Sequence, residues 1–388
     1  MEYVRLNELC NINIGKTPSR NKQIYWGKGV KWLSISDLKD KFINETKEQI
    51  TEKAISECNM KIVPKDTVVM SFKLSIGKVA ILKEDMYTNE AIANFSIKDD
   101  TKLIPEYLYY SIKTLDFNNT DRAVMGATLN KSKLNELKIP YCAVEKQNKI
   151  VNVLDKAQFL IDKRKAQIED LDELVKSRFI EMFGDPIINK NNYDVKILDD
   201  ICIKITDGTH NSPPNTIEGV PYVTAKHLKE DGLDFYSDPT YVSLKDHEVI
   251  YKRCNPVKGD ILYIKDGATT GIAAINNYDF EFSMLSSLAL LKLKRSIINN
   301  QYLVKYLNNK RVKGKIINDM VGGAIKRLTL IRIKSIKVVV PPLEIQNEFA
   351  DFVKQIDKLK FEMEKSLKEL EDNFNSLMQK AFNGELFN

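Results

Sequence analysis

The sequence predicts an α+β protein: two duplicated mixed α/β units, separated by two long helices that form an antiparallel coiled coil with pseudo-two-fold symmetry. Two observations lead to this prediction. Segments of the first half recur in the same order in the second half, and two long stretches contain no glycine or proline. The predicted parts are a first unit (residues 1–144), a first long helix (145–183), a second unit (184–343), and a second long helix with its tail (344–388).

The internal repeat extends through both units, with an offset that drifts from about 190 to 199 residues. "LNELCNINIGKTPSR" at Leu6 is echoed by "LDDICIKITDGTHNSP" at Leu198, and "VPKDTVVMSFKLSIGKVAIL" at Val63 by "VKGDILYIKDGATTGIAAI" at Val257. Apolar alternation in "DTVVMSF" and "DILYIKD" predicts short strands that end at glycine-containing turns. "EYLYYSIKTL" and "QYLVKYLNN" predict short amphipathic helices. One structural unit is therefore used twice.

Each long helix begins in the same way, after a proline and with a Glu-x-Gln pair. A helix of about 38 residues would be roughly 57 Å long at 1.5 Å per residue. Sustained apolar spacing of three and four residues predicts a seam that faces one partner helix. The seam residues are Ile150, Leu154, Ile161, Ile168, Leu171 and Val175 in the first helix, and Phe349, Val353, Ile356, Met363, Leu367, Leu370 and Phe374 in the second. The alternative is that each helix packs only on its own unit.

Composition indicates a globular protein that lacks a membrane span and resides in the cytoplasm. Apolar residues make up 43% and charged residues 29% of the 388 residues, and no apolar run approaches the length of a membrane helix. The five cysteines lie far apart, which is typical of reduced thiols. Lys and Arg outnumber Asp and Glu by 22 to 18 in residues 1–144 and by 23 to 17 in residues 183–343. This modest positive charge on both units favours nucleic acid as a partner.

The sequence contains none of the common catalytic motifs. It has no phosphate-binding G-x-x-x-x-G-K-[ST] loop and no dinucleotide-binding G-x-G-x-x-G. The three histidines, His210, His227 and His247, have no neighbours at metal-ligand spacing. We therefore predict no catalytic, cofactor-binding or metal-binding residues, although a nuclease site built from scattered Asp, Glu and Lys stays an alternative.

Three pairs of loops at equivalent places in the two units carry the residues that suit contact with DNA. Lys and Arg bind phosphates and guanine edges, while Ser and Thr bind phosphates or either base type. The candidates in the first unit are Lys16, Arg20, Lys22, Lys28, Lys73, Ser75, Lys78, Lys131 and Lys133. Those in the second unit are Thr209, His210, Lys265, Thr269, Thr270, Lys326 and Arg327. The alternative for any one of them is an ordinary solvated turn.

The chain resembles the specificity subunit of a type I restriction–modification system along essentially its whole length. The resemblance rests on the two divergent units, on "DGTHNSP" at Asp207–Pro213, on the Glu-x-Gln helix starts, and on "FGDP" at Phe183–Pro186. It implies two target-recognition domains that each read one half of a bipartite, asymmetric site on double-stranded DNA. It also implies that the helices set the spacing between the half-sites and dock two methyltransferase subunits.

The resemblance implies further partners and excludes cofactors from this chain. Restriction-translocase subunits would join the full complex, and S-adenosylmethionine, ATP and Mg²⁺ would bind to partner subunits. The chain itself would not be an enzyme. One alternative is a system in which a single partner fuses the methyltransferase and the nuclease. Another is a non-catalytic coiled-coil scaffold with duplicated binding modules, which would show no salt-dependent affinity for DNA.

Overall fold

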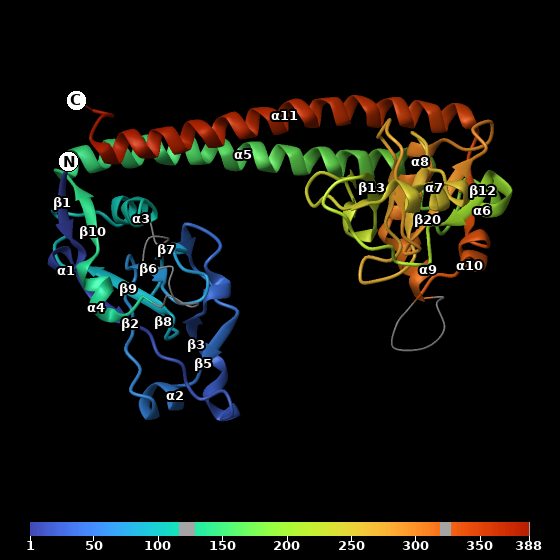
Figure 1. Ribbon diagram of the computed structural model, residues 1–388. Helices are drawn as coiled ribbons and strands as arrows, with labels where there is room; N and C mark the ends of the chain where they lie inside the picture. The colour runs from blue at the N-terminus through green and yellow to red at the C-terminus, as the bar shows by residue number, and fades with distance from the viewer. Residues whose placement is uncertain (116–128, 319–326, 388) are drawn as a thin grey trace. The chain divides into compact units, whose positions relative to one another are not determined.

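The computed structural model describes residues 1–115, 129–318 and 327–387, which form two compact units (Figure 1). Unit 1 contains Met1–Lys165 together with Lys365–Asn388, and unit 2 contains Ala166–Glu364. Each long helix therefore contributes one half to each unit.

Unit 1 contains antiparallel and mixed sheets together with short helices. Its five-stranded sheet has the order β2 (Cys10–Ile14), β9 (Ile92–Ile97), β6 (Val68–Ser71), β7 (Val79–Leu82), β4 (Phe42–Ile43). A three-stranded sheet has the order β5 (Glu48–Ile50), β3 (Trp26–Leu33), β8 (Tyr87–Thr88), and β1 (Glu2–Arg5) pairs with β10 (Lys138–Tyr141). In the described residues of unit 1, its short α-helices are α1 (Leu6–Leu9), α2 (Glu52–Glu57), α3 (Pro105–Lys113) and α4 (Lys131–Glu136).

Unit 2 repeats the strand order of the sheets in unit 1, apart from β4. Its main sheet has the order β12 (Cys202–Asp207), β20 (Leu288–Leu293), β17 (Ile261–Ile264), β18 (Ala273–Ile275). The three-stranded sheet has the order β16 (Tyr241–Val242), β13 (Val220–Val223), β19 (Ser283–Met284), and β11 (Asp194–Ile197) pairs with β21 (Lys337–Val340). The helices α6 (Leu198–Ile201), α7 (Leu244–Arg253), α8 (Asn300–Asn308) and α10 (Leu330–Lys334) follow the same order as their counterparts. The predicted α+β fold with a duplicated unit is confirmed.

The two units differ mainly at the edges of this shared scaffold. In the described part of the chain, strand β4 extends the main sheet of unit 1 only, while unit 2 has a short hairpin of β14 (Leu228–Lys229) and β15 (Gly232–Leu233). In unit 2 the helix α9 (Lys310–Asn318) follows α8; the residues of unit 1 at the equivalent place lie outside the described residues.

The long helices are α5 (Val144–Phe183) and α11 (Leu343–Asn383), and they run antiparallel within each unit. In unit 2, Lys360 Nζ lies 2.8 Å from Asp172 Oδ1, and the rings of Phe179 and Phe349 lie 5.5 Å apart. In unit 1, Lys165 Nζ lies 2.8 Å from Glu371 Oε1. Nine of the predicted seam residues are buried; Ile168, Met363, Leu367 and Leu370 are half-buried.

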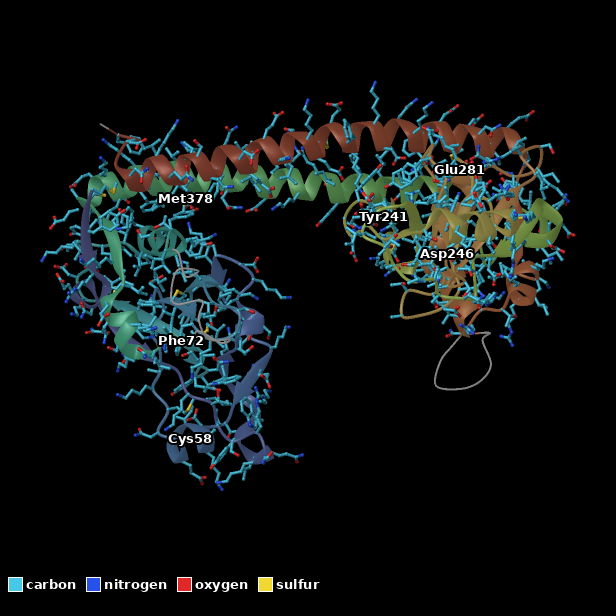
Figure 2. The ribbon with its side chains drawn as sticks, viewed as in Figure 1. Cys58, Phe72, Tyr241, Asp246, Glu281 and Met378 are labelled. Atoms are coloured by element: carbon cyan, nitrogen blue, oxygen red, sulfur yellow. The ribbon has the colours of Figure 1, made fainter. Side chains whose placement is uncertain are left out.

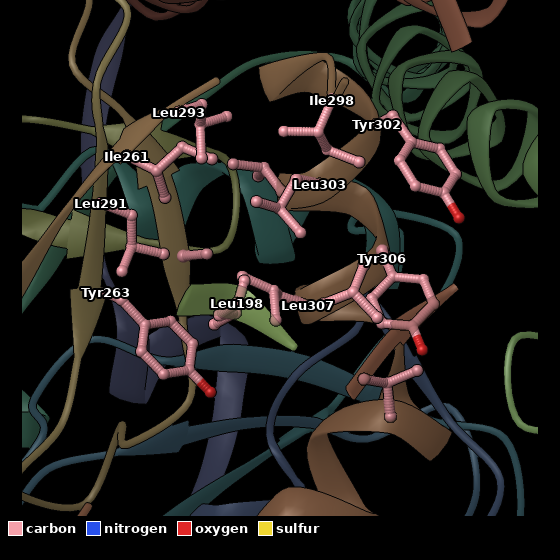
Figure 3. Packing of buried hydrophobic residues seen from close by; sticks show 14 of the residues in the cluster. Leu198, Ile261, Tyr263, Leu291, Leu293, Ile298, Tyr302, Leu303, Tyr306 and Leu307 are labelled. Atoms are coloured by element: carbon pink, nitrogen blue, oxygen red, sulfur yellow. The ribbon is translucent and has the colours of Figure 1, made fainter. Parts of the chain in front are cut away.

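The core of each unit joins its main sheet to the long helices. Figure 3 shows this packing in unit 2, where Leu198, Ile261, Leu291 and Leu303 lie between the sheet and α8. Tyr302 of α8 packs on Phe179 with ring centroids 5.6 Å apart, and its hydroxyl donates to the Val339 carbonyl at 2.8 Å. Its counterpart in unit 1, Tyr107, donates to the Pro140 carbonyl at 2.9 Å.

The repeated Glu-x-Gln motif has a structural reason, because its glutamine is fully buried in both units. Gln147 donates to the carbonyls of Lys102 and Cys142, both at 2.8 Å, and accepts from the Ile104 amide at 3.1 Å. Gln346 makes the same three contacts in unit 2, with the carbonyls of Ile297 and Pro341 and the amide of Asn299. Each glutamine thus fixes the start of a long helix to the segment that precedes α3 or α8.

Candidate nucleic-acid interface

The predicted loops begin at one glycine in each unit, where the chain leaves the main sheet and crosses the three-stranded sheet. The Gly15 amide donates to Ile92 O at 3.1 Å, and the Gly208 amide donates to Leu288 O at 3.4 Å. A Cβ atom on Gly15 would lie 2.2 Å from the Asn89 carbonyl, and one on Gly208 would lie 2.0 Å from the Met284 carbonyl. Only glycine permits this crossing, so the two loops start from equivalent, sterically fixed points.

In unit 2 the loop after Gly208 is built around a buried carboxylate. The Asp207 side chain is 2% exposed and accepts contacts from Lys265 at 2.9 Å, Arg253 at 2.5 Å and His210 at 3.2 Å. The Lys265 side chain is itself only 6% exposed. Lys265 therefore stabilises the loop from within, and its position does not support the direct DNA contact that the sequence predicts for it.

The other predicted residues of unit 2 converge on the same cluster. Arg327 donates to Asp266 at 2.6 Å, and the Leu328 amide donates to the Lys265 carbonyl at 2.9 Å. The structure thus brings together the three loops that the sequence singled out. Within them, Thr209, His210, Thr269 and Arg327 are exposed or half-buried, whereas Thr270 is buried with its hydroxyl on the Gly267 carbonyl; Lys326 lies outside the described residues.

In unit 1 two tryptophans hold the loop that carries Lys16 and Arg20. The indole N–H of Trp32 donates to the Lys16 carbonyl at 3.0 Å, and that of Trp26 donates to the Ser19 carbonyl at 3.2 Å. The Arg20 guanidinium lies 3.8 Å above the Trp26 ring and pairs with Glu48, which holds the pKa of that carboxyl below its usual value. Arg20 is therefore oriented by an aromatic face and a carboxylate before any ligand binds.

The remaining candidates of unit 1 lie on the surface. The Lys16 ammonium donates to the Cys58 carbonyl at 2.6 Å, and the Lys22 ammonium donates to the Tyr25 hydroxyl at 2.9 Å. Lys28, Ser75, Lys78, Lys131 and Lys133 are exposed, and Lys73 is half-buried. The loop Phe72–Gly77 and the loop after Gly15 lie on either side of one segment, because the Phe72 amide donates to Ala91 and the Gly15 amide to Ile92.

Sequence reasoning missed helix α9, which extends the cationic surface of unit 2. Lys313 packs its stem against Gly271, close to the candidate loop, and its ammonium contacts Glu230 at 3.2 Å. Lys310 and Lys315 of the same helix are exposed. The signal was present in the sequence, because residues 305–337 hold ten Lys and Arg against one Asp, whereas the equivalent residues 110–138 hold five against three acids.

No group of three or more His, Cys, Asp or Glu side chains is arranged to hold a metal ion in residues 1–115, 129–318 and 327–387. Over the same ranges, no helix has the length and apolar character needed to cross a membrane. A cavity of about 600 Å³ in unit 2 is lined by Pro221, His247, Tyr251 and Glu281. Its histidine contacts the Ser283 hydroxyl at 3.1 Å, and that serine is fully buried.

Comparisons with known proteins agree with this organisation. The chain is 28% identical to the type I restriction enzyme MjaIX specificity subunit of Methanocaldococcus jannaschii, over 98% of this chain and 92% of that protein. Its fold is similar to that of a chain in a solved structure on complex assembly and conformational transition of the type I R-M system (TM-score 0.62, 18% identity, 99% of this chain and 98% of that chain). The type I restriction–modification S subunit from M. genitalium gives a TM-score of 0.52 at 16% identity, over 98% of this chain and 96% of that chain. The model of the type I restriction modification DNA specificity domain matches residues 1–170 and 190–372, and the chain therefore belongs to this family.

Proposed function

We propose that this chain is the non-catalytic DNA-reading subunit of its complex, and that each unit reads one half of a bipartite, asymmetric site. The observation that carries the proposal is the pairing of an equivalent scaffold with divergent loops. Both loops start at a glycine crossing, yet Lys16 and an Arg20–Trp26 stack follow in unit 1, while Asp207, Thr209 and His210 form the loop in unit 2. Two copies of one surface with different side chains suit two different half-sites.

The long helices suit the second part of the proposal, that they set the distance between half-sites. Both α5 and α11 contribute to both units, so neither unit can be shifted along the helices without breaking an antiparallel seam. We keep the four-part division at residues 1–144, 145–183, 184–343 and 344–388 as the proposed functional boundaries.

Exposed apolar side chains on the same helices support a docking role toward two methyltransferase subunits. Phe159 is 64% and Phe361 is 65% exposed, and Leu160 and Leu359 are also exposed. Large apolar groups at such positions are typical of a surface that another protein covers. Methylation and cleavage, with S-adenosylmethionine, ATP and Mg²⁺, would then belong to the methyltransferase and restriction-translocase partners.

The test is a domain exchange read out as a methylation motif. The chain is expressed with its methyltransferase partner, and methylated sites are mapped by sequencing. Replacing residues 1–144 with the equivalent domain of a relative is expected to change one half-site only, and replacing residues 184–343 is expected to change the other. A motif altered in both halves by either exchange, or methylation at unrelated sites by the unmodified chain, would contradict the proposal.

A further inference from the structure

The loop Phe72–Gly77 of unit 1 joins β6 to β7 and is held rigidly by one buried serine. Ser71 is fully buried; its carbonyl accepts from the Gly77 amide at 2.9 Å, and its hydroxyl oxygen accepts from the Lys78 amide at 3.1 Å. The same hydroxyl donates to the Ser75 carbonyl. Phe72, labelled in Figure 2, is 1% exposed and anchors the start of the loop in the core. The apex of this loop therefore has a fixed conformation.

Leu74 occupies the apex in a conformation and environment that leucine normally avoids. Its φ is +60° and its exposed fraction is 91%. Among the described residues, the four other non-glycine residues with positive φ are all Asn or Asp, which tolerate this region through local hydrogen bonds. A bulky apolar residue at positive φ is strained, and such strain persists only where the surrounding structure enforces it.

The equivalent residue of unit 2 shows that the scaffold does not require leucine here. Leu74 is the third residue after β6, and the third residue after β17 is Gly267, with φ +101°. The loop of unit 2 is one residue longer before it closes, since Gly77 donates to Ser71 and Gly271 to Ile264. Glycine adopts this conformation without a steric cost. Neither the backbone nor the core therefore explains the leucine, since its side chain is exposed at the tip of the loop.

The surroundings of Leu74 favour DNA as the partner that it meets. Lys73 and Lys78 flank it in the same loop, with Lys78 exposed and Lys73 half-buried at 5.4 Å from the Phe72 ring. Lysines suit phosphates, whereas an apolar tip between them suits base edges such as a thymine methyl group or a partly unstacked base step.

We propose that Leu74 is an apolar base-contact residue of unit 1: it enters a groove of the duplex and discriminates bases, while Lys73 and Lys78 hold the phosphates on either side. This inference rests on the proposed DNA-reading function. The rigid loop presents the side chain already in place, so little conformational entropy is lost on binding.

The experiment compares Leu74→Gly and Leu74→Ala with Ile62→Ala, an equally simple truncation of another exposed apolar residue of unit 1 (53% exposed). All three are expected to fold, and Leu74→Gly is expected to melt no lower than the unmodified chain because glycine relieves the strain. In complex with the methyltransferase partner, both Leu74 variants are expected to lose about ten-fold in discrimination at one or two positions of one half-site. Their salt dependence should not change, and Ile62→Ala should behave like the unmodified chain.

A lysine variant completes the test. Lys73→Ala with Lys78→Ala is expected to flatten the dependence of log affinity on log salt by about 0.9 per lost phosphate contact, with base preference retained. Unchanged discrimination by the folded Leu74 variants would overturn the proposal. So would a loss of methyltransferase docking with normal base preference, because Leu74 would then be a protein contact. The proposed function stands or falls separately, on whether the unmodified complex methylates a bipartite site at all.

Discussion

Removing one partner of the buried Asp207–Lys265 pair should destabilise unit 2 far more than replacing both partners. Asp207→Asn leaves the Lys265 ammonium, 6% exposed, with no carboxylate beside it. Leaving an uncompensated buried charge costs about 3–5 kcal/mol, while well-packed apolar residues in place of a buried ion pair are often neutral or stabilising. We therefore expect a loss of about 3–5 kcal/mol for Asp207→Asn, and a much smaller change for Asp207→Leu combined with Lys265→Met.

Unit 1 supports the second half of this expectation, since it has an apolar pair at the same place. Ile14 precedes the Gly15 crossing as Asp207 precedes Gly208, and Phe72 follows β6 as Lys265 follows β17. The Phe72 amide donates to Ala91 and the Lys265 amide to Ser287, which confirms the equivalence. Phe72 is buried in the core of unit 1, and the partly buried Ile14 packs against that core. The same scaffold thus accommodates either an apolar pair or an ion pair at this place.

Hydrogen exchange of amides in β12 and β17 measures the stability of unit 2, and a double-mutant cycle isolates the pair. Tryptophan fluorescence serves as the control, because Trp26 and Trp32 are the two tryptophans of the chain and both lie in unit 1. The unfolding transition of unit 1 that this fluorescence follows should be the same in all variants. If Asp207→Asn costs less than about 1 kcal/mol, or the double replacement costs as much as the single one, the reasoning about the buried charge is refuted.

Three other predictions concern the rest of the chain. Lys310→Ala with Lys315→Ala in α9 should lower the slope of log affinity against log salt by up to about 0.9 per residue. Replacing both lysines with arginine should keep the slope of the unmodified chain. An unchanged slope in the alanine variant would place α9 away from DNA. Burial raises the pKa of the Cys10 thiol to about 12, so at pH 8 this group stays protonated and unreactive, and alkylation followed by mass spectrometry should label the half-buried Cys58 first. Equal labelling of both would contradict this. Gln346→Leu should lower the stability of unit 2 by about 1–3 kcal/mol, measured by hydrogen exchange, because the buried Pro341 carbonyl and the half-buried backbone groups of Ile297 and Asn299 lose their partner. A neutral effect would mean that water replaces the glutamine.

Those parts of the fold that depend on local pattern could be predicted from the sequence. Apolar spacing and the absence of glycine and proline predict two long helices that start at residues 145 and 344. Helices α5 and α11 start at Val144 and Leu343, one residue earlier in each case. The in-order repeat gives the duplication, because equivalent segments must fold alike. The repeated Glu-x-Gln was noticed as a helix start, but its buried role was not, since nothing local shows that Gln147 bonds to residues about 45 positions away.

The candidate interface was predicted less well, because its decisive features depend on contacts between distant segments. Lys265 looks like any loop lysine until β12 places Asp207 beside it. The net charge of a whole unit does not reveal helix α9, because the other residues of the unit dilute the basic segment 305–337. The backbone of Leu74 could not be inferred either, since leucine gives no sign of positive φ and only the comparison with Gly267 makes it informative.

The two units together separate the residues that build the scaffold from those that distinguish the surfaces. The glycine crossings, the buried glutamines and the tyrosines of α3 and α8 make the same contacts in both units. Ile14 and Asp207, and Phe72 and Lys265, occupy equivalent positions that are apolar in unit 1 and charged in unit 2. Leu74 and Gly267 are each the third residue after β6 and β17. These positions adjoin the candidate loops, while the strands beside them keep the same order in both units. Exchanging a whole unit should therefore transfer specificity, whereas replacing Asp207 alone or Lys265 alone should damage unit 2 unless the other residue is replaced with it.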